Sequence, residues 1–67
     1  MEAGVKNKFV GKITAIKSDD IMAQVTVQVG DNTITSVMTT ESLHDAGFKE
    51  GDTVTALTKA IHVVLIK

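Results

Sequence analysis

The groups in this sequence that could contact a ligand are hydroxyls, backbone donors and single lysines. Thr39, Thr40 and Ser42 lie together at the predicted start of a short helix. The first N–H groups of a helix lack intrahelical partners, and the helix dipole favours negative charge there. These donors therefore form one candidate site for a small anion, although ordinary helix capping would also explain them.

Two further groups combine a lysine with other donors. Thr58, Lys59 and Ala60 lie at the junction of the last two predicted strands, where the ladder is interrupted and backbone N–H groups are free to bond elsewhere. Lys59 is the one charge in a long apolar and threonine-rich stretch, so enclosing its ammonium group requires an anionic partner. The third group, Lys6-Asn7-Lys8, precedes the first predicted strand, and a solvated N-terminal arm is its alternative interpretation.

The sequence offers little for catalysis or for a metal cation. A nucleophile needs an oriented base, and the two histidines are His44 on the predicted helix and His62 in an apolar run. We interpret His44 as solvated and His62 as a subunit contact. The chain has no cysteine and no phosphate-binding glycine loop, and Asp19-Asp20 fits a turn. We expect a binding protein with no enzymatic activity, no directly ligated metal cation and no organic cofactor.

The elements that must position these groups are mostly strands. Apolar residues alternate with mainly polar ones over residues 21–29, which predicts a half-buried strand. Gly30-Asp31-Asn32 supplies a turn, and the β-branched run at 33–39 completes an antiparallel hairpin. We expect three further strands, at 8–17, 53–59 and 61–66.

One short helix interrupts the strands. Residues 39–47 begin with N-cap residues and end at Gly47, which suits the position after a helix. Phe48 is expected to seat the helix end on the sheet. Five short strands with a helix between the third and fourth predict an all-β fold, a five-stranded Greek-key barrel of the OB type, because closure removes exposed edges.

The size of the chain predicts association. A length of 67 residues gives one domain, spanning 1–67, with a small core and no disulfide to reinforce it. In the last predicted strand Ile61, Val63 and Leu65 point one way, while Val64 and Ile66 point the other. A strand that is apolar on both faces has one face left for another subunit. We therefore expect a homo-oligomer.

Composition narrows the class of partner. Hydrophobic residues make up 43% and charged residues 22%, with a formal net charge of -1. That balance gives no long-range field to attract a polyanion. The longest apolar run is far shorter than the ~20 residues that span a bilayer, and the N-terminus lacks a secretory pattern. We expect a cytoplasmic protein that contacts neither membrane nor nucleic acid.

The order and spacing of four segments resemble the molbindin family, whose Mop domains bind molybdate and tungstate. The likeness covers essentially the whole chain. Each segment alone is weak evidence for the family, but the order and spacing of the four together are specific. The segments are Lys6-Asn7-Lys8 with Gly11-Lys12, residues 35–42, residues 47–52 and residues 56–60.

The resemblance implies an OB-type barrel, a hexamer with oxyanion sites between subunits, and storage, buffering or homeostasis of molybdate or tungstate. The family's Ser-x-Arg-Asn start corresponds to Gly4-Val5-Lys6-Asn7, so this chain lacks the serine hydroxyl and has an ammonium where the family has a guanidinium. Its Thr-x-x-Ser corresponds to Thr39–Ser42, and its Lys-small pair to Lys59-Ala60. The expected oxyanion-binding residues are Gly4, Lys6, Asn7, Thr39, Ser42, Thr58, Lys59 and Ala60.

Two alternatives belong to other functional classes. OB barrels often bind single-stranded nucleic acid by stacking bases on aromatic side chains in a basic groove. This chain has only two aromatic residues, Phe9 and Phe48, and no arginine. Both base stacking and electrostatic attraction to a nucleic acid should therefore be weak. The other alternative is an interaction domain without a ligand, in which all three donor groups are caps and turns.

Overall fold

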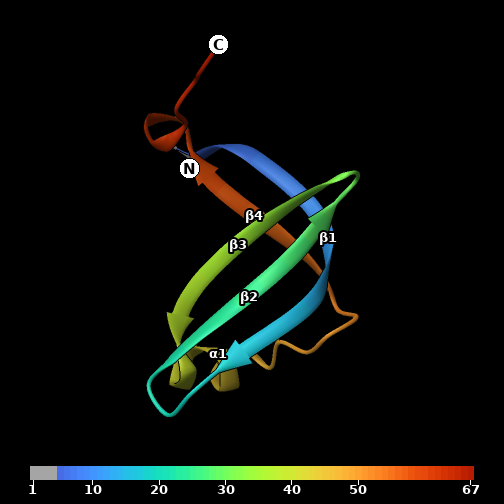
Figure 1. Ribbon diagram of the computed structural model, residues 1–67, viewed down its shortest axis with the longest axis vertical. Helices are drawn as coiled ribbons and strands as arrows, with labels where there is room; N and C mark the ends of the chain where they lie inside the picture. The colour runs from blue at the N-terminus through green and yellow to red at the C-terminus, as the bar shows by residue number, and fades with distance from the viewer. Residues whose placement is uncertain (1–4) are drawn as a thin grey trace.

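The fold is a single curled antiparallel sheet with one short helix at its end (Figure 1). A computed structural model describes residues 5–67, with side chains from Asn7 onward. The predicted mostly-β fold with one helix is confirmed, and the sheet order is β3-β2-β1-β4. In chain order the elements are β1 (Val5–Ser18), β2 (Met22–Val29), β3 (Asn32–Thr39), α1 (Thr40–Ala46), β4 (Thr53–Lys59) and the 3-10 helix η1 (Ala60–His62).

The long strand β1 holds the sheet together because it pairs with two neighbours in succession. Its first half pairs with β4, from Val5 to Lys12, and its second half pairs with β2, from Lys12 to Ser18. Gly11 lies at the change of partner. A Cβ atom there would overlap the carbonyl oxygen of Gln28 and lie 2.9 Å from Val27 Cγ1. The missing side chain therefore allows β1 to pass close over β2, and the sheet curls at this point.

The predicted hairpin is confirmed, and Ala23, Val25 and Val27 of its expected apolar face are buried. Ile21, which was expected on the same face, lies before β2 and is 72% exposed. Val29 pairs with Asn32 across a two-residue turn in which Gly30 has a φ of 58°, a value that favours glycine. The inward residues of β2 form the centre of a small core, whose members are at most 5% exposed. That core comprises Ile13, Ala23, Val25, Val27 and Leu43.

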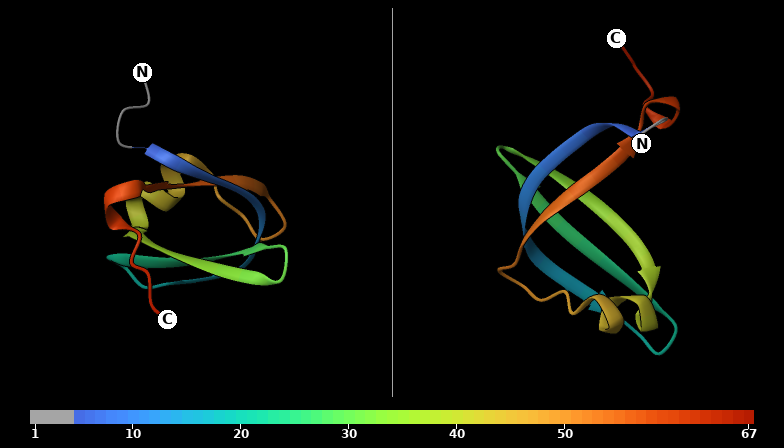
Figure 2. Two further views of the ribbon diagram at one scale, coloured as in Figure 1. Left: turned by 90° about the horizontal axis from the view of Figure 1, so that it is seen from above. Right: turned by 180° about the vertical axis from the view of Figure 1, so that it is seen from behind.

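The helix α1 closes one end of the curled sheet (Figure 2). Leu43 is its one buried residue and joins the core. The helix ends as expected at Gly47, which has a φ of 72° and donates from its N–H to the carbonyls of Leu43 and His44. Phe48 packs against the core directly after the helix, as predicted. Neither helical element of the described chain has the length and hydropathy needed to cross a membrane.

The prediction of a fifth strand at 61–66 is wrong. After β4 the chain turns through η1, and residues 63–67 pair with no strand among the described residues. The five-stranded barrel is therefore replaced by four strands, with β3 and β4 as unpaired edges. The physical reason is that the apolar, β-branched residues of this segment favour an extended strand, but a strand also needs a neighbouring strand to pair with. The first strand is also longer than the predicted 8–17.

The turn between β1 and β2 anchors the start of α1. The Asp19 carboxylate accepts hydrogen bonds from the N–H groups of Ile21 and Met22, both at 2.8 Å. Thr40 Oγ1 donates to the Asp19 carbonyl at 2.8 Å, and Thr40 N–H donates to the Ile21 carbonyl at 2.8 Å. This network ties the end of β3 to the turn, so it fixes where the helix begins.

We predict that Gly11→Ala lowers the free energy of unfolding by about 1–3 kcal/mol, because the new methyl group meets a backbone carbonyl that cannot rotate away. Urea denaturation measures the change. The matched control is Lys12→Ala, at the exposed neighbouring position, which should change stability by no more than about 0.5 kcal/mol. Equal stability of Gly11→Ala and the parent protein would contradict the close crossing.

The Asp19 turn predicts a specific acid sensitivity. Hydrogen bonds from the backbone of Met22, and then of Ile21, lower the pKa of Asp19 below its ordinary value. Because the folded pKa is depressed, the stabilisation is present above the unfolded pKa of about 3.9 and is lost as the pH falls through the folded pKa. Asp19→Asn should therefore reduce stability at neutral pH, and its deficit should shrink in acid.

Urea denaturation at several pH values would follow this deficit, and NMR titration would give the Asp19 pKa directly. Asp20→Asn is the control, because no hydrogen bond to the Asp20 side chain is found in the described chain. An Asp19 pKa at or above that of a solvated aspartate would contradict the prediction.

Candidate functional site

The structure brings one set of predicted site residues together where β1 begins and β4 ends. Val5 pairs with Lys59, and Asn7 pairs with Thr58. Backbone pairing thus joins two segments that are about fifty residues apart in the sequence, and it places Lys6 between two paired positions. Asn7 and Thr58 are half-buried there. The predicted residue Gly4 lies outside the described residues.

Lys59 differs from its expected environment. The sequence predicted an ammonium group enclosed by threonines and apolar side chains, but in the single chain Lys59 is exposed, as is Ala60. Strand β4 alternates half-buried and exposed residues, and Lys59 falls on the exposed face. The enclosure that would make this charge depend on an anion is therefore not made by one copy of the chain.

The second set of predicted residues forms the start of α1. Thr39 is the N-cap: its Oγ1 accepts from the Ser42 N–H at 3.0 Å and donates to Ser42 Oγ at 2.8 Å. The Thr39 hydroxyl is thus occupied by capping. The Ser42 hydroxyl accepts from Thr39, and its own proton has no acceptor within the described part of the chain. Both side chains are exposed, so Ser42 is the hydroxyl left to donate to a ligand.

The two sets lie at opposite ends of the molecule (Figure 1). Thr39 pairs with Met22, next to the turn that follows the end of β1, whereas Lys59 pairs with Val5 at its beginning. The 14-residue strand β1 runs between them, in a molecule whose longest extent is 35 Å. One small ion therefore cannot contact Ser42 and Lys59 of the same copy.

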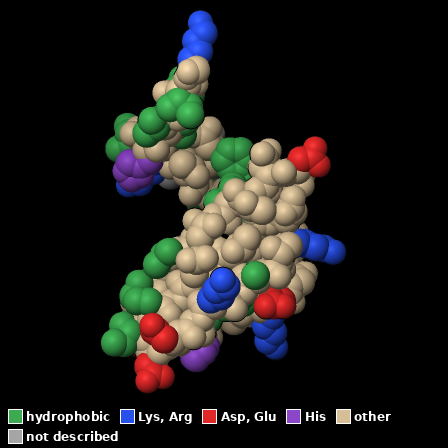
Figure 3. Space-filling view, viewed as in Figure 1, with side chains coloured by type: hydrophobic (Ala, Val, Ile, Leu, Met, Phe, Trp, Pro, Cys, Tyr) green, Lys and Arg blue, Asp and Glu red, His purple; other side chains and the backbone are tan. Residues whose placement is uncertain are grey.

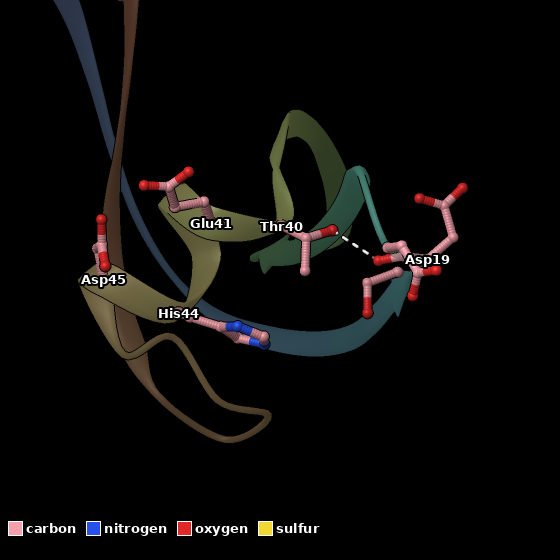
Figure 4. A pocket seen from close by; sticks show the side chains of 7 residues that line it. Asp19, Thr40, Glu41, His44 and Asp45 are labelled. Carbon is pink, nitrogen blue, oxygen red and sulfur yellow. Dashed lines mark hydrogen bonds between the residues drawn. The ribbon is translucent and has the colours of Figure 1, made fainter.

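A cavity of about 690 Å³ beside α1 is chemically unsuited to an anion. Its walls carry Asp19, Asp20, Glu41 and Asp45 together with His44, and these carboxylates repel negative charge. In Figure 4, Glu41 and Asp45 lie on the other side of the cavity from Asp19. No group of three or more potential metal ligands gathers in the part of the chain that is described.

Sequence reasoning missed the role of Thr40. It was grouped with the ligand candidates, but its hydroxyl bonds to the Asp19 carbonyl and so positions the helix start. The signal was not visible in the sequence, because the contact spans 21 residues and depends on the hairpin register. Its function here is to hold Thr39 and Ser42 in place.

Comparison with known proteins gives consistent results. The sequence model of the TOBE domain matches residues 5–65. Molybdenum-pterin-binding proteins 3 and 1 of Clostridium pasteurianum are 31% and 33% identical to this chain, each over 98% of both sequences.

Two solved structures share the fold. MopII from Clostridium pasteurianum superposes with a TM-score of 0.86 at 32% identity, covering 92% of this chain and 94% of that one. A molybdate-binding protein from Sporomusa ovata superposes with a TM-score of 0.90 at 27% identity over 100% of both chains. With matches of this extent in both sequence and structure, the chain belongs to the TOBE-domain family, as one of its molbindin (Mop) members.

Proposed function

We propose that this protein binds molybdate and tungstate at sites shared between copies of the chain, and that it stores or buffers these oxyanions in the cytoplasm without a catalytic step. The proposed assembly is a homohexamer. The names of its relatives support molybdenum binding. The donors in this chain support an oxyanion as the bound species.

A tetrahedral dianion needs hydrogen-bond donors, a compensating positive charge and no facing carboxylate. The end of β4 supplies Lys59 together with the half-buried Asn7 and Thr58. The start of α1 supplies the Ser42 hydroxyl. No acid occurs among the eight predicted site residues, in contrast to the cavity lined by four carboxylates.

The observation that carries the shared-site proposal is the separation of the two donor sets. The Ser42 hydroxyl and the Lys59 ammonium group lie at opposite ends of β1 in one chain. A complete shell drawn from both therefore requires residues of different copies. Such a site links ligand binding to assembly by mass action, because the ligand binds only the associated form.

Exposed apolar side chains support association independently. Val10, Ile21, Val37 and Leu57 are all more than half exposed, although the core of this small domain is limited. Scattered exposed apolar residues are normal on a monomer. Here they occur on β1, β3 and β4 as well as on the C-terminal segment, which fits a subunit with several contact faces.

A bare oxyanion fits better than a pterin compound or a nucleic acid. A flat heterocycle binds largely by stacking on aromatic side chains. Phe48 packs against the core, which leaves only Phe9, 39% exposed, as an aromatic platform. The net charge of -1 also gives no attraction for a polyanionic strand.

Equilibrium dialysis against molybdate, tungstate, sulfate and a short single-stranded DNA tests the proposal. We expect molybdate and tungstate to bind and the DNA to remain free. Native mass spectrometry should show the oxyanion on the oligomer and none on any dissociated chain. Absence of molybdate binding would overturn the proposed function, whereas tight binding to single chains would overturn the shared site alone.

We predict that Ser42→Ala weakens molybdate binding by about 1.5–3 kcal/mol, the range for a hydrogen bond to a charged group. Stability without ligand should change little, because the capping bond uses the Ser42 backbone N–H and survives. Thr39→Ala is the matched comparison, since it removes the cap and should cost about 1 kcal/mol of stability. Calorimetric titration and urea denaturation measure the two effects. Equal losses of affinity and stability in Ser42→Ala would return this residue to a purely structural role.

Lys59→Met keeps an aliphatic stem and deletes the charge. Because Lys59 is exposed in the single chain, the empty protein should fold and assemble normally. Molybdate affinity should fall by about 2 kcal/mol, roughly thirtyfold, through loss of a charge-assisted contact. The control is Lys49→Met, an exposed lysine in the connection between α1 and β4. Titration of molybdate into both variants is the test, and near-parental affinity of Lys59→Met would remove this residue from the site.

A further inference from the structure

The paired segments of β1 and β4 carry positive charge only. The ladder between them joins residues 5–12 to residues 53–59. These two segments contain no acidic residue, and their four lysines are Lys6, Lys8, Lys12 and Lys59. The formal net charge of -1 therefore conceals an uneven distribution, in which this part of the sheet is basic. A local cluster of one sign raises the concentration of small ions of the opposite sign around it, even where the net charge is close to zero.

The acidic residues are concentrated at the other end of β1. Asp19, Asp20, Glu41 and Asp45 line the cavity beside α1. On the face of the described chain that Figure 3 draws, acidic side chains appear at this lower end, whereas none appears where β4 leads into η1. A small anion is therefore repelled at the α1 end and attracted at the end of β4.

Three of the lysines share one face of the ladder. Exposed residues alternate with half-buried ones along β4, and both Leu57 and Lys59 are exposed. Lys8 pairs with Leu57, and Lys12 pairs with Thr53, which is exposed as well. Directly paired residues lie on the same face of a sheet, and Lys8 and Lys12 are accordingly exposed. Because Leu57 lies two residues before Lys59, Lys8 and Lys59 are diagonal neighbours, with Cα atoms roughly 7–8 Å apart.

We propose that Lys8 is a further determinant of oxyanion affinity, and that its charge acts on the bound dianion through space. This inference rests on the proposed function, because it concerns an oxyanion bound at Lys59. The Lys59 ammonium group neutralises one of the two negative charges of molybdate. Among the described side chains of this face, Lys8 is the lysine closest to Lys59 in the ladder. Its positive charge therefore stabilises the remaining negative charge of the ion.

The place of Lys8 in the ladder separates its role from that of Lys59. Lys59 ends β4 next to Thr58, at the position where the proposed second copy encloses the ion. Lys8 lies inside the ladder, opposite the exposed Leu57, with its own side chain exposed to water. A solvated ammonium group attracts an anion weakly and is screened by salt, whereas a contact inside an enclosed site is screened much less. The two roles therefore differ in their salt dependence.

Lys12 should contribute less than Lys8. It lies farther from Lys59 on the same face, and its pairing partner Thr53 directly follows Asp52. The Asp52 carboxylate accepts a hydrogen bond from the Lys49 N–H at 3.0 Å, so its negative charge is held near this end of the ladder. That charge offsets part of the positive field of Lys12. The contribution should therefore decrease with distance from Lys59.

Calorimetric titration of molybdate at two salt concentrations tests the proposal. We expect Lys8→Met to weaken binding about threefold in about 20 mM sodium chloride, and less than about twofold in about 300 mM, because the Debye length falls from roughly 20 Å to roughly 6 Å. Lys12→Met should show a smaller loss with the same salt dependence. Lys59→Met should lose affinity at both concentrations. Lys49→Met is the control, since this exposed lysine lies outside the ladder, and it should bind as the parent protein does.

Lys8→Arg separates charge from packing, because it keeps a positive charge on a long side chain. It should bind molybdate with parental affinity, and urea denaturation should show equal stability for both Lys8 variants and the parent protein. Parental affinity of Lys8→Met in low salt would overturn the proposal while leaving molybdate binding intact. An equal loss in both salts, or the same loss in Lys8→Arg, would overturn it as well, since either would indicate a contact or a structural role. If the parent protein binds no molybdate, the proposed function fails together with this inference.

Discussion

The structure depends on the path of β1, which must pair with β4 and with β2 in turn. A strand can do this only by bending across its neighbour, and Gly11 provides the close approach to the Gln28 carbonyl that the bend requires. The curl then carries β3 and β4 round to face one another across a common cavity. The core, the two open edges of the sheet and the positions of the donor groups all follow from that bend.

Limited chain length explains why the single chain has a small core and many exposed apolar side chains. Five residues form the buried core, and a domain of this size gains little net stability from such burial. Four strands leave two edges open, while four apolar residues after η1 remain exposed. A disulfide or metal could have compensated, but the chain has no cysteine. The proposed association would cover exposed apolar side chains that a single chain does not bury.

The positions of the donor groups in one chain explain why the proposed site would be shared between copies. Residues that start or end strands gather at opposite ends of β1, so the register of the sheet separates the Ser42 hydroxyl from the Lys59 ammonium. An exposed lysine binds anions weakly because water screens it. A second subunit would lower the local dielectric and add donors, which makes oxyanion affinity a property of the assembly. The turn held by Asp19 and Thr40 contributes by fixing the helix start.

The sequence alone determined the local elements. Alternation identified β2, turn chemistry identified the hairpin at Gly30, and capping residues identified α1, because each depends on neighbours within a few residues. The residue types that make up the donor groups could also be read from the sequence. Only the tertiary structure decided that residues 61–66 form no strand, that Lys59 is exposed, and that Ser42 and Lys59 lie far apart. Those facts depend on register and on which edges remain open, and both are set by long-range pairing through β1.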